Sequence, residues 1–193
     1  MNKMQKKIEE KMIDENFKMS IENKKNGIFI INSNFTDILL EYLFLDIKKA
    51  INNKSIDIIK IYINSRGGEI STLFPLIDLI KGTEKPINTI VMGMAYSAGA
   101  MLALCGTNGF RFAHKHSYIL LHEVATDNGY SKNSQIQENA KYIDEINKRL
   151  IELLKRNSKM TNKQIDIYFN SNKDIFINST KALNYGIIDK IIL

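Results

Sequence analysis

The chain has 193 residues, 44% of them hydrophobic and 25% charged, so it can hold one domain with its own core and has an ordinary globular composition. Its formal net charge is +6, but the lysines are scattered among acidic residues and Ile- and Asn-rich segments, without a basic stripe interleaved with aromatic residues, which argues against nucleic-acid binding. The single cysteine, Cys105, excludes a disulfide within the chain and is typical of a reducing compartment; we expect it to be a small buried hydrophobe.

The first 26 residues are charged and lack a strong apolar face. We therefore expect a loosely ordered or partner-dependent arm over residues 1–26, followed by one domain over residues 27–193. The arm has no apolar stretch of the kind that secretory signals need, and it carries acidic residues, which transit peptides largely lack. We therefore expect a cytoplasmic protein.

Short apolar strands alternate with amphipathic helices from residue 27 onward. Strands are predicted over Ile28–Ile31, Ile56–Ile63 and Ile87–Gly93. Asn34 or Thr36 can cap the helix after the first strand, and a second helix follows the Asn64–Gly68 turn, with Pro75 in its first turn or at a kink. This alternation predicts an α/β fold with a largely buried sheet.

The uncharged run over residues 87–110 is long enough to cross a bilayer, so a transmembrane helix has to be weighed. Polar residues and glycines interrupt the run, among them Asn88, Gly93, Ser97 and Gly106. They make a continuous helix unfavourable, whereas a strand, a turn and a short helix buried within the protein fit the pattern. We expect no membrane segment.

Ser97 lies in the stretch Met94-Ala-Tyr-Ser-Ala-Gly-Ala100, where the predicted strand turns at once into an Ala-rich helix. The unpaired N–H groups and the dipole at a helix N-terminus favour developing negative charge, which suits a catalytic nucleophile. A serine at this position can equally be a simple helix cap. The stretch alone leaves both interpretations open.

The C-terminal half begins with a predicted strand, Ser117–His122, and continues with a long polar helix over about 131–157. The apolar residues of this helix follow near-heptad spacing, which is typical of a core or subunit contact: Ile136, Ala140, Ile143, Leu150 and Leu154. A capping box formed by Thr161 and Gln164 predicts the next helix. Gly186 is expected to end the last helix before a strand over Ile187–Leu193.

Of the three histidines, His114 and His116 lie in a Lys-containing turn, where a surface role is favoured over metal binding because no cysteine or second pair is nearby. We expect no metal site. His122 differs because it ends an apolar strand, where the active-site rim of an α/β fold would lie. A core histidine satisfied by the backbone is the alternative interpretation.

A serine nucleophile needs a base, an acid that orients the base, and backbone donors for the oxyanion. The α/β-hydrolase order of serine, acid and histidine is excluded, because no acidic residue lies between Ser97 and His122 and no histidine follows His122. The remaining order is serine, histidine, and then an acid further along the chain.

The chain resembles the proteolytic subunit of the Clp protease, the ClpP-like serine peptidase family. The segments that carry this resemblance are Tyr62-Ile-Asn-Ser-Arg-Gly-Gly68, Gly93-Met-Ala-Tyr-Ser-Ala-Gly-Ala100, Arg111-Phe-Ala113, Ile119-Leu-Leu-His122 and Ala182-Leu-Asn-Tyr-Gly-Ile-Ile-Asp189. They stand in the family's order and cover about residues 56–193.

The resemblance implies an α/β fold of the ClpP/crotonase type, built from strand–helix units with a long protruding handle helix at about 131–157. It also implies roles for five residues. Ser97 is the expected nucleophile and His122 the base. Asp174, in Asn172-Lys-Asp-Ile-Phe-Ile-Asn178, is the expected acid, while the backbones of Gly67 and Ala98 would form the oxyanion hole.

The function implied is a serine endopeptidase that cleaves unfolded polypeptides inside a barrel of two stacked heptameric rings. The handle helix would pack between the rings through Ile136, Ile143 and Leu150. An AAA+ Clp unfoldase would be a separate partner and the user of ATP, so no cofactor is expected in this subunit. Neither nucleic acid nor membrane is an expected partner.

The sequence departs from the family pattern around the expected site. Arg66 replaces the proline of the Gly-Gly turn, Tyr96 replaces a small residue, and Glu123-Val124 replaces the Gln-Pro that follows the base. The N-terminal region does not resemble the family's axial hairpin. Two alternatives stay open: a non-catalytic structural subunit of a mixed barrel, and a crotonase-like acyl-CoA enzyme in which paired amides stabilise a thioester enolate.

Overall fold

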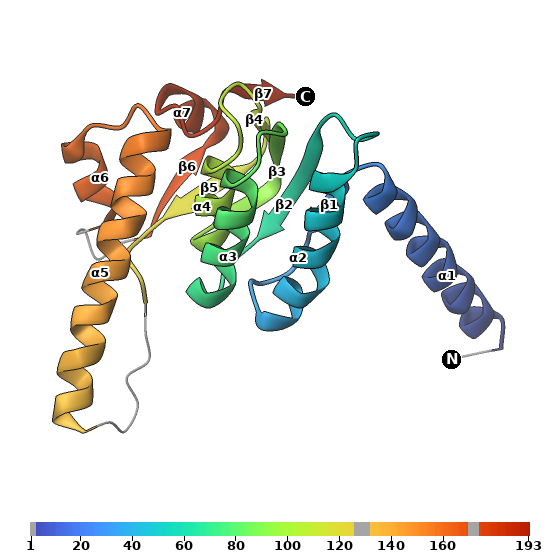
Figure 1. Cartoon of the computed structure of the whole chain (residues 1–193), viewed down its shortest axis with the longest axis horizontal. Coiled ribbons are helices and arrows are strands. Elements are labelled where there is room, and N and C mark those ends of the chain that lie inside the picture. Colours follow the sequence, from blue (N-terminus) through green and yellow to red (C-terminus); the bar gives the residue numbers. More distant parts are fainter. Residues whose placement is uncertain (1–2, 126–131, 170–173) are drawn as a thin grey trace.

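The computed structural model describes residues 3–125, 132–169 and 174–193 (Figure 1). In chain order the elements are α1 (Lys3–Lys25), β1 (Ile28–Ile31), α2 (Asp37–Asn52), β2 (Ile59–Ser65), α3 (Ile70–Lys81), β3 (Ile87–Tyr96), α4 (Ala98–Leu104), β4 (Arg111–His114), β5 (Tyr118–Leu121), α5 (Asn133–Asn157), α6 (Asn162–Phe169), β6 (Ile175–Asn178), α7 (Ser179–Asn184) and β7 (Lys190–Ile192).

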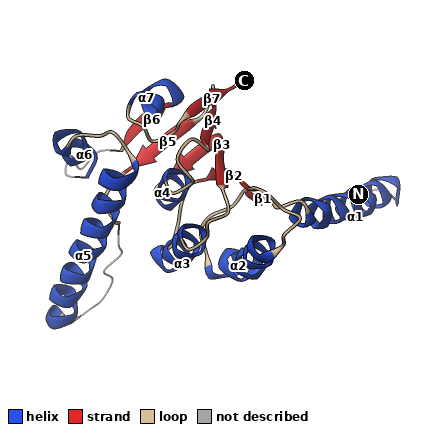
Figure 2. Ribbon diagram, turned by 45° about the horizontal axis from the view of Figure 1, so that its top comes forward, coloured by secondary structure: helices blue, strands red, loops and turns tan. Residues whose placement is uncertain are grey.

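The strands of the described residues form one sheet in the order β1-β2-β3-β4-β7, and all of these neighbours are parallel. β5 pairs in parallel with the second half of β3, and β6 pairs antiparallel with β5. α2, α3 and α4 lie together on one face of the sheet (Figures 1 and 2). The predicted α/β fold is confirmed.

β3 changes partner halfway along its length. Thr89–Val91 pair with β4, whereas Met94–Tyr96 pair with β5. Gly93 lies between the two halves with φ +91°, and Ser117 bridges the point where β4 and β5 part, because its hydroxyl donates to the Val91 carbonyl at 3.0 Å and accepts from the Gly93 amide at 3.1 Å. The predicted end of this strand at Gly93 is therefore wrong, and the strand carries the chain on to Ser97.

Local signals in the sequence account for several element ends. Thr36, and not Asn34, is the N-cap of α2, and its hydroxyl accepts from the Leu39 amide at 3.3 Å. The Thr161 and Gln164 capping box is present at the start of α6. Pro75 lies inside α3, beyond the first turn. β4 and β6 were not predicted as strands, because four-residue segments with polar ends have too short a pattern to be recognised.

Regular structure extends further toward the N-terminus than expected, since Lys3–Lys25 form α1. Its last part is tied to the domain: Lys24 pairs with Asp46 of α2 at 2.8 Å and lies over the Tyr42 ring at 4.2 Å. The hydrogen bond from Lys24 lowers the pKa of Asp46. The rest of α1 extends away from the sheet (Figures 1 and 2).

The long predicted helix is confirmed as α5, whose N-terminal half projects from the molecule (Figures 1 and 2). Residue 131 of its expected range lies outside the described residues. The apolar stripe divides in two: Ile136 is 39% exposed, whereas Leu150 and Leu154 are 4% and 0% exposed within this chain's own core. The assignment of Leu150 to a contact between rings is therefore wrong, because the C-terminal half of the helix packs on the domain.

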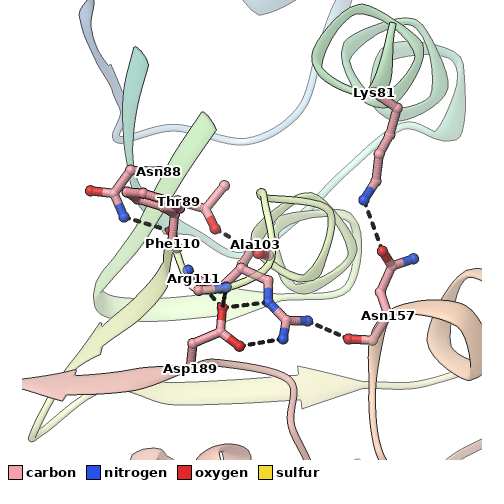
Figure 3. A network of polar contacts seen from close by, with 9 residues as sticks. Lys81, Asn88, Thr89, Ala103, Phe110, Arg111, Asn157 and Asp189 are labelled. Carbon is pink, nitrogen blue, oxygen red and sulfur yellow. Dashed lines mark hydrogen bonds and ion pairs between the residues drawn. The ribbon is translucent and has the colours of Figure 1, made fainter. Parts of the chain in front are cut away.

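A polar network fixes the C-terminal end of α5 to the sheet (Figure 3). The Arg111 guanidinium pairs with Asp189 through its Nε at 2.9 Å and through a second nitrogen, and it also donates to the Asn157 carbonyl at the last turn of α5. Lys81 of α3 donates to the Asn157 side chain at 2.8 Å. Both cations lie where the helix dipole favours positive charge.

None of the helices in the described ranges combines the length and the apolar character that crossing a bilayer requires. The uncharged run over residues 87–110 forms β3, α4 and the turn after them, as expected.

Candidate active site

Ser97 occupies the junction between β3 and α4. Its φ is 53° and its ψ is −121°, and it is the one non-glycine residue with positive φ among those described. Its side chain makes no capping hydrogen bond to α4, so the simple helix-cap interpretation does not hold. Such a conformation costs about 1–3 kcal/mol and persists only where neighbouring structure imposes it. Here the Ser97 amide donates to the Leu120 carbonyl of β5 at 2.9 Å.

The Gly-Gly turn lies directly against this junction. Gly67 has φ +96°, and a Cβ built on it would lie 2.7 Å from the Ser97 Cβ and 3.0 Å from the Ala98 nitrogen. Ser65 supports the turn: its hydroxyl accepts from the Gly67 amide at 3.0 Å and donates to the Ser33 carbonyl at 2.6 Å. The two backbones predicted for the oxyanion hole, Gly67 and Ala98, are therefore adjacent.

Phe35 clamps the same turn from the other side. Its amide donates to the Gly67 carbonyl at 2.8 Å, its carbonyl accepts from the Glu69 amide at 2.9 Å, and it is fully buried. A Cβ on Gly68 would lie 2.3 Å from the Phe35 carbonyl oxygen. Phe35 was not predicted, because a single aromatic residue in a loop carries no pattern that points to a partner far along the chain.

Strand pairing brings His122 to Ser97. In the parallel register of β3 and β5, Tyr96 pairs with Leu120, so Ser97 stands beside Leu121 and His122 is the next residue. Both residues are half-buried and line one narrow cavity of about 10 Å³, with apolar walls that include Leu73, Met101 and Leu150.

The His122 ring already holds a defined tautomer. Its Nδ1 lies 2.5 Å from the Glu123 carbonyl oxygen. A carbonyl oxygen can only accept, so Nδ1 carries the proton of the neutral ring and Nε2 is left as an acceptor. An unprotonated Nε2 is what a base for the Ser97 hydroxyl needs.

Asp174 precedes β6, the strand that pairs with the strand leading to His122. β5 and β6 are antiparallel, with Leu121 paired to Ile175, so the next position of the register places His122 opposite Asp174. Directly opposite side chains share a face and have Cβ atoms about 5 Å apart. His122 and Asp174 line a second cavity of about 310 Å³, with Tyr168 and Phe169 in its wall. No hydrogen bond joins Ser97, His122 and Asp174 to one another, although the structure describes all three.

The residues that depart from the family pattern lie around this arrangement. Tyr96 packs edge-to-face on Phe176 of β6, with ring centroids 5.4 Å apart, and so ties the end of β3 to the strand that follows Asp174. Arg66 is exposed. Glu123 is exposed and, with Val124, lines both cavities.

Other candidate groups lie outside the site. Cys105 is buried at the end of α4, and burial raises the pKa of its thiol to about 11, as suits the expected small hydrophobe. His116 is exposed and His114 half-buried, near the end of β4. Among the residues that the structure describes, no group of three or more His, Cys, Asp or Glu side chains could hold a metal ion.

Comparison with known proteins identifies the family of this chain. The sequence model of the Clp protease family matches residues 10–193. Among curated proteins of Frankia casuarinae, the ATP-dependent Clp protease proteolytic subunit 3 is 31% identical over 167 residues, covering 86% of this chain and 75% of that protein. The proteolytic subunit 2 of the same organism is 32% identical over 166 residues, covering 86% of this chain and 73% of that protein. The family match extends over nearly the whole chain, and the chain therefore belongs to the Clp protease family.

Proposed function

We propose that this protein is a serine endopeptidase of the Clp type, with Ser97 as nucleophile, His122 as base and Asp174 as the acid that orients the base. The observation that carries the proposal is the register of three neighbouring strands. Ser97 directly follows β3, and His122 directly follows β5 and lies beside Ser97. Asp174 directly precedes β6 and lies opposite His122. A structural role requires no such convergence of a hydroxyl, an imidazole and a carboxylate.

In the proposed reaction the Ser97 hydroxyl attacks the carbonyl carbon of the scissile peptide bond, and His122 Nε2 takes its proton. The Gly67 and Ala98 amides stabilise the oxyanion. For this role the Gly67 amide has to break its hydrogen bond to the Ser65 hydroxyl, which is 3.0 Å long. His122 then gives the proton to the leaving amine, and a water molecule hydrolyses the acyl-enzyme by the same steps in reverse.

Assembly is part of the proposal, because the hydrogen bonds of the triad are not formed within the single chain. We infer a barrel of two stacked heptameric rings that draws Asp174 to the His122 ring, and an AAA+ Clp unfoldase that supplies unfolded polypeptide and uses ATP. The reaction needs no cofactor in this subunit. The proposed compartment is the cytoplasm.

The same missing hydrogen bonds favour one second candidate, a non-catalytic subunit that lends structure to a mixed barrel. The two functions differ in the reactivity that we expect of the Ser97 hydroxyl. In the endopeptidase it reacts with a fluorophosphonate label, and in the structural subunit it does not. Turnover of an acyl-CoA without peptidase activity would instead support a crotonase-like enzyme.

The deciding experiment measures hydrolysis of short fluorogenic peptides by the assembled protein and by its Ser97→Ala variant. The variant should lose activity and labelling with its assembled mass unchanged, since little packing depends on the hydroxyl. Ser71→Ala is the matched control, because this serine is exposed on α3 and bonds only the neighbouring Glu69. Wild-type turnover in Ser97→Ala would refute the mechanism.

A further inference from the structure

The segment after His122 is held by α5. The Val124 amide donates to the Asn147 side-chain oxygen, Oδ1, at 2.9 Å. Both residues are half-buried, and Asn147 lies on the part of α5 that packs on the domain, one residue after the buried Ile146. This hydrogen bond joins residues 23 positions apart, so it fixes a loop that has no strand partner of its own at this point.

The peptide unit that Asn147 holds is the same one that holds the His122 ring. A peptide group is planar, and the carbonyl of Glu123 and the N–H of Val124 are its two ends. At one end Val124 donates to Asn147, and at the other end the Glu123 oxygen accepts from His122 Nδ1 at 2.5 Å. Turning this plane to break one hydrogen bond therefore also removes the other.

We propose that Asn147 is a positioning residue for the base: through the Glu123–Val124 peptide it keeps the proton on His122 Nδ1 and leaves Nε2 to accept from Ser97. In the assembled protein the Glu123 carbonyl shares this Nδ1–H with Asp174 in a three-centre hydrogen bond. The proposal rests on the endopeptidase function put forward above. It adds a residue of α5 to the site, and this residue acts through the Glu123–Val124 peptide without touching the reacting atoms.

The identity of residue 124 makes the proposal testable. A proline at this position would have no N–H and could not bond Asn147, while its ring would restrain the backbone by itself. Val124 supplies the amide that Asn147 needs. The contribution of Asn147 should therefore exist only while residue 124 carries an N–H.

The experiment measures kcat and KM of the assembled full-length protein on a fluorogenic peptide. Asn147→Leu removes the acceptor at similar volume and should lower kcat about tenfold, or about 1.4 kcal/mol in activation free energy, with KM nearly unchanged. Asn147→Asp keeps an acceptor oxygen and should retain kcat within about threefold. Asn139→Leu, an exposed position on the same helix, is the control and should change neither constant.

A double-mutant cycle with Val124→Pro separates positioning from packing. In the Val124→Pro background, Asn147→Leu should alter kcat by less than about twofold, because the hydrogen bond is already gone. An equal loss in both backgrounds would overturn the proposal and assign Asn147 to helix packing. Assembled mass is measured for every variant, and Asn147→Ala replaces Asn147→Leu in the cycle if the leucine variant assembles poorly.

The two proposals fail in different ways. If Ser97→Ala keeps its activity, the endopeptidase mechanism fails, whatever Asn147 does. If Ser97→Ala is inactive and Asn147→Leu matches the wild type, only the role of Asn147 is refuted.

Discussion

Asp189→Asn tests whether the polar network at the end of α5 holds the domain together. One Asp189 oxygen accepts from the Gly109 amide at 2.8 Å, from the Arg111 amide at 3.0 Å and from Arg111 Nε at 2.9 Å, and the other pairs with the guanidinium. The substitution keeps the shape of the side chain and removes its charge, so Arg111 stays buried without a counter-ion.

The expected loss is about 3 kcal/mol in the free energy of unfolding. Removing one partner of a buried ion pair costs about 3–5 kcal/mol, and the lower end applies because the Arg111 side chain is 7% exposed but that of Asp189 is 22% exposed. For a chain of this length each kcal/mol shifts Tm by about 2–4 °C, which gives a fall of about 6–12 °C.

The assay is thermal and denaturant unfolding of both proteins at the same subunit concentration, since assembly contributes to the measured stability. Glu152→Gln is the control, because Glu152 forms an exposed pair with Arg156 at 3.5 Å, and it should cost less than about 1 kcal/mol. A loss from Asp189→Asn no larger than that of the control would refute the reasoning.

The difference should also depend on pH. Burial alone would raise the pKa of Asp189, but hydrogen bonds and charge from Arg111 outweigh it and hold that pKa below its usual value. Asp189 therefore stabilises the protein fully above its unfolded pKa of about 4, and the contribution is lost as the pH falls through the lower folded value. The gap between wild type and Asp189→Asn should close in acid and stay constant near neutrality.

Three further substitutions probe the site and the assembly. Gly67→Ala should abolish peptide hydrolysis, because its Cβ would lie 2.7 Å from the Ser97 Cβ. Gly109→Ala is the control, because Gly109 also has a positive φ, +86°, but a Cβ there would meet open space; it should keep activity and lose only about 1–2 kcal/mol of stability. Asp174→Asn should keep the fold but lower kcat/KM by orders of magnitude, since in the proposed triad His122 loses the charge that stabilises its imidazolium; an unchanged rate would point to another acid. Ile143→Glu should split the proposed double ring into single rings in sedimentation, and an intact assembly would place this face of α5 elsewhere.

Local patterns in the sequence were enough for most of the strand–helix order and for naming Ser97 as a candidate nucleophile. Strand and helix periodicity, the Thr36 cap and the glycine-rich turns act over a few residues, so they can be recognised without the fold. The absence of an acidic residue between Ser97 and His122, and of a histidine after His122, also excluded the α/β-hydrolase arrangement before any geometry was known. The family resemblance then supplied Asp174, which no local pattern distinguishes from other acidic residues.

Only the tertiary structure decided which distant residues meet. The antiparallel register of β5 and β6 sets Asp174 opposite His122, and β6 is too short to be predicted. Packing of the C-terminal half of α5 on the domain buried Leu150 and placed Asn147 against the Val124 amide, although both residues belong to a helix whose composition suggests a surface. The positive φ of Ser97 likewise follows from contacts with β5 and the Gly67 turn. Sequence periodicity reports which face of an element is apolar, whereas register and long-range hydrogen bonds determine what that face meets.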